Sequence, residues 1–154
     1  MRVSIFSRAG IQALIDGEFP ANAAVISFYS PAGMKAADYA PVDYRGRAQR
    51  LMYVCAPDLN LDALPRFGLS YETFMPEADA LADFIRQAAA DGMDIVCQCD
   101  YGQSRSAACC AAILEFYESR GIEIFANYAY YPNQVVFNRV LEALQVSEGR
   151  ESKP

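Results

Sequence analysis

Residues 94–114 read DIVCQCDYGQSRSAACCAAIL, and this stretch decides the fold. Its first part, DIVCQ, is mostly apolar and predicts a strand, whereas the residues from Ser106 onward are apolar on nearly every side and predict a buried helix. Between them, Gly102 supplies the backbone freedom that a tight turn needs. A strand, a short loop and a buried helix in this order are typical of α/β domains with a mainly parallel sheet.

Strand and helix patterns also alternate along the rest of the chain. Apolar runs predict strands at residues 2–6, 23–28 and 50–56, and helical spacing of apolar residues predicts helices at residues 7–17, 73–92 and 133–145. The run at 23–28 is continuous, as in a strand buried on both faces. We therefore predict a three-layer α/β domain with a central sheet of four or five mainly parallel strands flanked by helices. We also predict a surface loop over residues 29–47.

The length of the chain indicates one domain. Its 154 residues, 53% of them hydrophobic, suffice for one sizeable core and are too few for two ordinary domains. We assign residues 1–146 to this domain and residues 147–154, SEGRESKP, to a polar C-terminal tail.

The charged residues exclude several classes of function. Acidic residues outnumber basic ones by 19 to 13, the net charge is −6, and Lys35 and Lys153 are the only lysines, so we expect no nucleic-acid or membrane partner. The chain contains 0 histidines, which excludes Ser-His-Asp triads, Cys-His pairs and HExxH zinc sites. Catalysis would have to use Cys, Asp, Glu, Arg, Tyr or the backbone.

The cysteines indicate a reducing compartment. The chain has 5 of them, an odd number, and it begins with a strand pattern and not with a signal peptide, so we predict a cytoplasmic protein. Most are expected in the core. Cys55 ends a strand that could neighbour the strand of Cys99, and a disulfide between these two is an open alternative.

The loop after the DIVCQ strand has the features of an anion-binding site. It places Cys99 at the carboxyl end of a strand and at the start of a helix, where α/β proteins bind anions. The N–H groups and the helix dipole at this position stabilise a thiolate, and Arg105 adds a full positive charge. The same donors suit the oxygens of a phosphate group, and Arg105 offers a bidentate contact.

The spacing of Cys99, Arg105 and Ser106, in the context of strand, loop and helix, resembles the signature of the protein tyrosine phosphatase superfamily. The sequence GQSRS, from Gly102 to Ser106, is most similar to its dual-specificity branch in a small bacterial-type domain, and the resemblance covers roughly residues 20–145. It implies that Cys99 is the nucleophile and forms a thiophosphate, that Arg105 holds the transition state, and that Ser106 hydrogen-bonds the sulfur. It also implies that the loop backbone binds the phosphate of a phosphorylated protein or a small phosphoester, without metal or other cofactor. The phosphate-binding residues would be Asp100, Tyr101, Gly102, Gln103 and Ser104.

The family also uses an aspartic acid from a separate loop as general acid, in keeping with the need to protonate a leaving group. Our first candidate is Asp58, which follows a buried strand and Pro57; Asp62 is the second and Asp43 the third. The residue before the nucleophile is commonly His in the family and is Gln98 here. Its amide donates a hydrogen bond but carries no charge, so weaker stabilisation of the thiolate is expected.

We therefore predict a cysteine-dependent phosphomonoester hydrolase. The alternatives are a phosphate-binding pseudophosphatase and a sulfurtransferase, although SRS after Gly102 fits phosphate better than sulfur transfer. Asp100 and the scarcity of lysine disfavour highly charged inositol phosphates and leave phosphotyrosine, phosphoserine or a small phosphoester. Three tyrosines, Tyr128, Tyr130 and Tyr131, form either a phosphotyrosine slot or a surface aromatic cluster.

Overall fold

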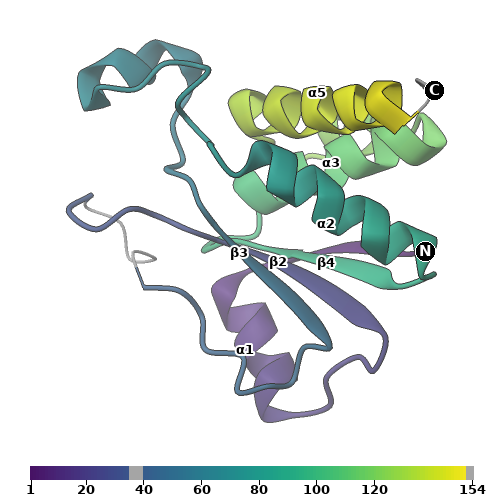
Figure 1. Cartoon of the computed structure of the whole chain (residues 1–154). Coiled ribbons are helices and arrows are strands. Elements are labelled where there is room, and N and C mark those ends of the chain that lie inside the picture. The colour runs from purple at the N-terminus through teal and green to yellow at the C-terminus, as the bar shows by residue number, and fades with distance from the viewer. Residues whose placement is uncertain (35–39, 152–154) are drawn as a thin grey trace.

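The computed structural model describes residues 1–34 and 40–151 and contains a four-stranded parallel sheet (Figure 1). Its strands lie in the order β1-β4-β2-β3, and every neighbouring pair is parallel. The strands are β1 (Val3–Phe6), β2 (Ala23–Tyr29), β3 (Arg50–Cys55) and β4 (Asp94–Gln98). The predicted α/β fold with a mainly parallel sheet is confirmed.

Helices cover both faces of this sheet. Helix α1 (Arg8–Asp16) lies on one face, and α2 (Ala78–Ala90), α3 (Arg105–Glu118) and α5 (Gln134–Glu151) lie on the other (Figure 1). Ser7 caps α1 by accepting a hydrogen bond from the Gly10 N–H, as expected for a serine before a helix. The sheet and its two helical layers are the predicted three-layer arrangement.

The hydrophobic core is divided by the sheet because side chains alternate along each strand. On β2, Ile26 and Phe28 belong to the main core under α2, α3 and α5, whereas Val25 belongs to a smaller core beside α1. All residues from 23 to 28 are buried, as predicted for a strand covered on both faces. The first ten residues of α3 are also buried, which agrees with the predicted buried helix.

The segment predicted as a surface loop is partly core. Val42 and Tyr44 are 3% and 2% exposed and pack in the smaller core beside α1. The two apolar side chains alternate with exposed Asp43. This irregular segment therefore turns one side toward the core and the other toward solvent, with the alternation that is typical of extended chain. Residues 35–39 of the predicted loop lie outside the described residues.

Two short elements were not predicted. The 3-10 helix η1 (Leu61–Phe67) begins after Asn60, whose side chain accepts a hydrogen bond from the Ala63 N–H, and ends at Gly68 in the left-handed region. Asn60 and Gly68 are residue types that commonly begin and end helices. Pro65 between them, however, is typical of a loop. The other element is the single turn α4 (Ile122–Phe125).

The C-terminal helix is longer than predicted. It runs to Glu151, through most of the segment 147–154 that was predicted as a polar tail. Polar residues other than glycine and proline have moderate helix propensity, and the one glycine in this segment disfavours a helix by only about 1 kcal/mol. Among the residues that the structure describes, no helix combines the length and apolar character needed to cross a bilayer.

All five cysteines are free. Strand β2 lies between β3, which ends at Cys55, and β4, which precedes Cys99. The expectation that these two strands are neighbours is wrong, and the disulfide between Cys55 and Cys99 is not formed.

Candidate active site

The loop from Cys99 to Ser104 joins β4 to α3 at the carboxyl edge of the sheet. Cys99 directly follows β4, and its N–H donates to the Phe6 carbonyl at 3.3 Å. Ser104 stands at the N-cap of α3, but its side chain makes no capping hydrogen bond to the helix. The start of α3 therefore keeps its positive end and its N–H groups directed at the loop, which favours an anion.

The junction of β1 and α1 supports this loop. Gly102 has a φ of 68°, and a Cβ atom on it would lie 2.7 Å from the Ser7 nitrogen and 3.0 Å from the Phe6 carbonyl carbon. Only glycine fits this combination of conformation and close approach. Arg8 adds a backbone hydrogen bond of 2.9 Å to the Asp100 carbonyl and an ion pair of 3.5 Å to its carboxylate. The Asp100 carboxylate is thus paired with the Arg8 guanidinium. It therefore repels anionic substrates less than an unpaired carboxylate would.

The structure brings the predicted nucleophile and its predicted helper together. The Cys99 Sγ lies 3.0 Å from the Ser106 Oγ, and both residues are buried. A hydroxyl at this distance donates to a sulfur anion and so stabilises it. This geometry agrees with the role that the resemblance gives to Ser106.

Arg105 is 4% exposed and is fixed from two neighbouring loops. Its Nη1 donates to the Ser30 Oγ at 3.2 Å and to the Ala56 carbonyl at 2.9 Å. Ser30 follows β2 and Ala56 follows β3, so the carboxyl ends of two strands orient the guanidinium. Sequence reasoning missed both partners because neither carries a chemical signature.

Gln98 occupies a buried polar network where the family commonly has His. Its Nε2 donates to the Cys99 carbonyl at 2.9 Å, and its Oε1 accepts from Tyr44 at 3.1 Å and from Ser27. The carbonyl can only accept, so the amide nitrogen must face Cys99 and the oxygen must face the two hydroxyls. Burial raises the pKa of Tyr44, which keeps its hydroxyl protonated as a donor. The neutral amide therefore still fixes the Cys99 peptide.

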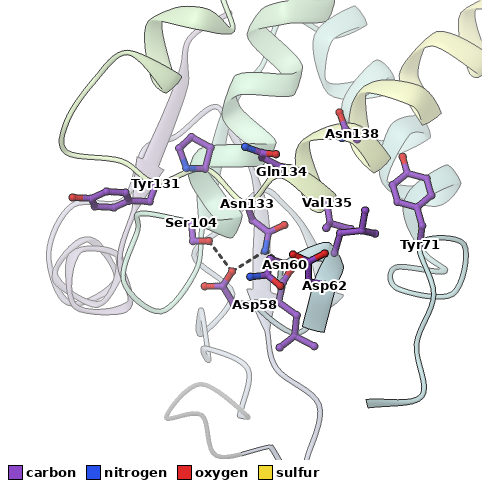
Figure 2. A pocket seen from close by; sticks show the side chains of 13 residues that line it. Asp58, Asn60, Asp62, Tyr71, Ser104, Tyr131, Asn133, Gln134, Val135 and Asn138 are labelled. Atoms are coloured by element: carbon purple, nitrogen blue, oxygen red, sulfur yellow. Dashed lines mark hydrogen bonds between the residues drawn. The ribbon is translucent and has the colours of Figure 1, made fainter. Parts of the chain in front are cut away.

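Asp58, the first candidate for the general acid, contacts the loop directly (Figure 2). Its Oδ1 accepts from the Ser104 hydroxyl at 2.7 Å and from the Asn133 amide at 2.9 Å. Its Oδ2 has no hydrogen-bond partner within the described chain, so this oxygen is available to carry a proton. The hydrogen bonds to Oδ1 therefore hold the Asp58 side chain in place, and Oδ2 remains accessible to a substrate group.

Asn133 is the residue that sequence reasoning missed most clearly. It is 8% exposed, and its amide nitrogen also donates to the Leu59 carbonyl at 2.9 Å. Its oxygen accepts from the Val136 N–H, and its own N–H donates to the Ser104 carbonyl. An asparagine just before a helix signals a cap, but the contact with Asp58 depends on chain segments that are distant in sequence.

The other two acidic candidates differ in position. Asp62 lines the same cavity as Asp58, in the first turn of η1. The Asp43 carboxylate accepts a hydrogen bond from the Arg45 N–H, next to Tyr44 on the α1 side of the sheet. The structure thus brings Asp58 and Asp62 to one cavity and leaves Asp43 outside its lining.

This cavity has a volume of about 490 Å³ and adjoins the loop from Cys99 to Ser104, which the sequence predicts to bind phosphate. Asp58 and Ser104 belong to its wall, but Cys99 and Arg105 do not. Of the remaining predicted loop residues, Tyr101 is 75% exposed and Gln103 accepts a hydrogen bond from the Tyr131 N–H at 2.8 Å. Tyr131 lines the cavity and is 74% exposed, and Tyr128 is 97% exposed, so these tyrosines do not form a packed aromatic cluster.

Three of the other thiols are held in the protonated form. Burial raises the pKa of Cys110 to about 12 and also raises the pKa of Cys55. A hydrogen bond with Cys109, together with burial, raises the pKa of Cys97. These thiols are therefore poor nucleophiles near neutral pH.

No family model matches the sequence, and no curated protein sequence matches it. The structure, however, is similar to solved structures over nearly its whole length. A crystal structure of PTPMT1 aligns with a TM-score of 0.52 and 15% sequence identity, over 99% of this chain and 96% of that chain. A crystal structure of PTPMT1 in complex with PI(5)P aligns with a TM-score of 0.51 and 14% identity, over 98% and 95%. PTPMT1 is a dual-specificity-type phosphatase, and this chain therefore has the fold of the protein tyrosine phosphatase superfamily.

Proposed function

We propose that this protein is a cysteine-dependent phosphomonoester hydrolase. The observation that carries the proposal is the contact of the Cys99 thiol with the Ser106 hydroxyl, at a strand-to-helix loop that Asp58 reaches through Ser104. A nucleophile, a hydroxyl that stabilises it and an acid meet at one loop, as covalent phosphoryl transfer requires.

In the first step the Cys99 sulfur attacks phosphorus. The S–P bond forms while the bond from phosphorus to the leaving oxygen breaks, and that oxygen takes a proton from the Asp58 carboxyl group. Arg105 and the N–H groups of the loop stabilise the charge on the other phosphate oxygens. The products of this step are the free alcohol or phenol and a thiophosphate on Cys99.

In the second step water attacks the thiophosphate. Asp58, now a carboxylate, takes the proton from water, and the S–P bond breaks to release inorganic phosphate. The Ser106 hydroxyl donates to the departing sulfur at the distance found here, 3.0 Å between the two atoms. Cys99 returns to its starting state.

The complex of PTPMT1 with PI(5)P supports a phosphoester as the substrate class. We expect the protein to lie in the cytoplasm. In keeping with its low lysine content, we also expect it to bind neither nucleic acid nor membranes.

The proposed chemistry predicts thiol-dependent and metal-independent turnover. We expect p-nitrophenyl phosphate hydrolysis to be the same with EDTA and with added Mg²⁺. Peroxide should abolish it, inorganic phosphate should slow that loss, and a thiol reductant should restore activity, because an anion-site thiolate oxidises first. The raised pKa values of Cys55, Cys97 and Cys110 protect those thiols from the same reaction. Turnover that requires a metal would contradict the mechanism.

Replacing the general acid should produce a loss that depends on the leaving group. Asp58→Asn keeps an oxygen for Ser104 and Asn133 but replaces the open carboxylate oxygen with an amide that cannot donate a proton in this way. We expect hydrolysis of phenyl phosphate to fall about a hundred- to ten-thousand-fold. Hydrolysis of dinitrophenyl phosphate, whose leaving group needs little protonation, should fall far less.

Asp62→Asn is the matched control, since Asp62 lines the same cavity. Steady-state kinetics on the two esters separates the candidates: if Asp62→Asn and not Asp58→Asn shows the leaving-group dependence, Asp62 is the acid. Phosphate binding without turnover of either ester in the wild-type protein would instead identify a pseudophosphatase.

A further inference from the structure

We infer that the cavity beside the phosphate-binding loop receives the leaving group, and that this leaving group is an uncharged polyhydroxylated moiety of about monosaccharide size. The inference rests on the proposed function and specifies its substrate as a sugar-like monophosphate. It draws on the chemistry of the cavity wall and on the position of that wall relative to Asp58.

The cavity is placed to hold a leaving group. Its wall includes Ser104 of the phosphate-binding loop and Asp58, the residue proposed to protonate the leaving oxygen. A leaving group that accepts a proton from Asp58 would therefore lie against this space. The volume of about 490 Å³ lies within the range of roughly 300–1,000 Å³ that is common for small-molecule sites.

The polar groups of the wall are mainly amides. Gln134 and Asn138 lie one turn apart on α5, so both side chains face the cavity, and Asn60 lies on the opposite side (Figure 2). The side chains of Gln134 and Asn138 form no hydrogen bond within the described residues, and the Asn60 oxygen caps η1 while its amide nitrogen has no such partner. Each amide offers a donor, and two of them also offer an acceptor, which suits hydroxyl groups that both donate and accept.

The charges of the wall exclude a second anionic group. Asp58 and Asp62 are the ionisable acids of the cavity, and none of the described residues that line it is Lys or Arg. Asp58 is neutral when it acts as the acid, but a second phosphate or a carboxylate on the leaving group would still approach the Asp62 carboxylate, and the wall holds no cation to compensate. A neutral polar leaving group meets no such penalty.

The edges of the cavity are aromatic. Tyr131 stands beside Ser104, and Tyr71 stands across the cavity, where its hydroxyl donates to Glu142 at 2.7 Å (Figure 2). Tyrosine rings offer an apolar surface to the C–H face of a sugar ring, with a hydroxyl at the margin. Amides in the middle and tyrosines at the edges together fit a polyol better than an anionic group.

The test compares five esters with the full-length protein. The substrates are glucose 6-phosphate, fructose 1,6-bisphosphate, p-nitrophenyl phosphate, a phosphotyrosine peptide and vesicles that contain phosphatidylinositol 5-phosphate. Leaving aside p-nitrophenyl phosphate, whose leaving group is activated, we expect the highest kcat/KM for glucose 6-phosphate, at least about tenfold above the bisphosphate, which corresponds to one unfavourable charge contact. A preference for the bisphosphate, the peptide or the vesicles would overturn the inference.

Variants of the amides test the wall itself. In Gln134→Leu and in Asn138→Leu, the ratio of kcat/KM for glucose 6-phosphate to that for p-nitrophenyl phosphate should fall about tenfold, since each removes one or two hydrogen bonds. Gln145→Leu is the matched control, because Gln145 is an exposed amide on the same helix outside the cavity, and it should leave the ratio unchanged. An unchanged ratio in both cavity variants would contradict the inference.

Calorimetry on Cys99→Ser separates this inference from the proposed hydrolysis. If the wild-type protein turns over no ester but the Cys99→Ser protein binds glucose 6-phosphate and loses that binding with Gln134→Leu, the hydrolase proposal fails and the sugar site stands. If p-nitrophenyl phosphate is hydrolysed and glucose 6-phosphate is neither bound nor cleaved, the hydrolase stands and the sugar site fails.

Discussion

Cys99→Ser should release no measurable phosphate from p-nitrophenyl phosphate, a loss on the order of 10⁵-fold or more, as expected when a covalent nucleophile is removed. A serine hydroxyl is a far weaker nucleophile than a thiolate, and the group next to it at this buried position, the Ser106 hydroxyl, is not a base. Binding of phosphate or vanadate should persist, because Arg105 and the loop backbone are unchanged. Phosphate release and isothermal titration on the same preparation measure both expectations.

Cys55→Ser is the control for that variant. Cys55 is a half-buried thiol at the end of β3, outside the phosphate-binding loop, and serine has nearly its size. We expect wild-type turnover from it. Full turnover in Cys99→Ser would show that another group attacks the phosphate, whereas loss of phosphate binding in a folded Cys99→Ser protein would show that the thiol itself organises the loop.

Arg105→Lys should lower kcat/KM for p-nitrophenyl phosphate by at least about a hundred- to a thousand-fold, the scale for loss of one fixed transition-state donor. The Arg105 Nη1 donates to the Ser30 hydroxyl and to the Ala56 carbonyl, and these two contacts orient the planar guanidinium. A lysine ammonium is a single point of charge and cannot contact those two partners and two phosphate oxygens at once. Steady-state kinetics measures the loss of turnover, and product inhibition by phosphate measures the loss of phosphate binding.

Arg47→Lys provides the comparison for a structural arginine. Arg47 donates to the carbonyls of Ile15 and Gly17 at 2.6 and 2.7 Å, so it fixes the end of α1 and lies outside the site. We expect Arg47→Lys to lower the melting temperature without changing kcat/KM. Unchanged kinetics in Arg105→Lys would show that the guanidinium does not contact the reacting phosphate.

The strand, loop and helix around Cys99 could be predicted because their signals are local. Within residues 94–114, strand propensity, a glycine and a buried helix follow one another, and no distant contact is needed to place Cys99 at a helix start. The position of Asp58 could also be predicted, since it follows a buried strand and parallel strands end at the same edge of a sheet. Topology and local pattern agree at both positions.

The partners of these residues could not be predicted, because they come from distant segments. Tyr44 reaches Gln98 across 54 residues, and Asn133 reaches Asp58 across 75. Each looks ordinary in its own neighbourhood: Tyr44 belongs to a segment rich in proline and glycine, and Asn133 resembles a simple helix cap. Tyr44 and Asn133 contact the predicted site residues only because the loops pack together at the edge of the sheet.

The close approach of Gly102 to Phe6 and Ser7 makes the shape of the loop depend on a pairing of distant segments. β1 pairs with β4 across more than 90 residues, in the register Val3 to Ile95, so the loop cannot take its final shape until the two ends of this segment have met. Pairings of such long range form slowly because a large chain loop must close first. A ligand that binds only the finished loop stabilises the native state by mass action. A phosphate ion that bound only the finished loop would therefore raise the free energy of unfolding of this chain, through the pairing of β1 with β4.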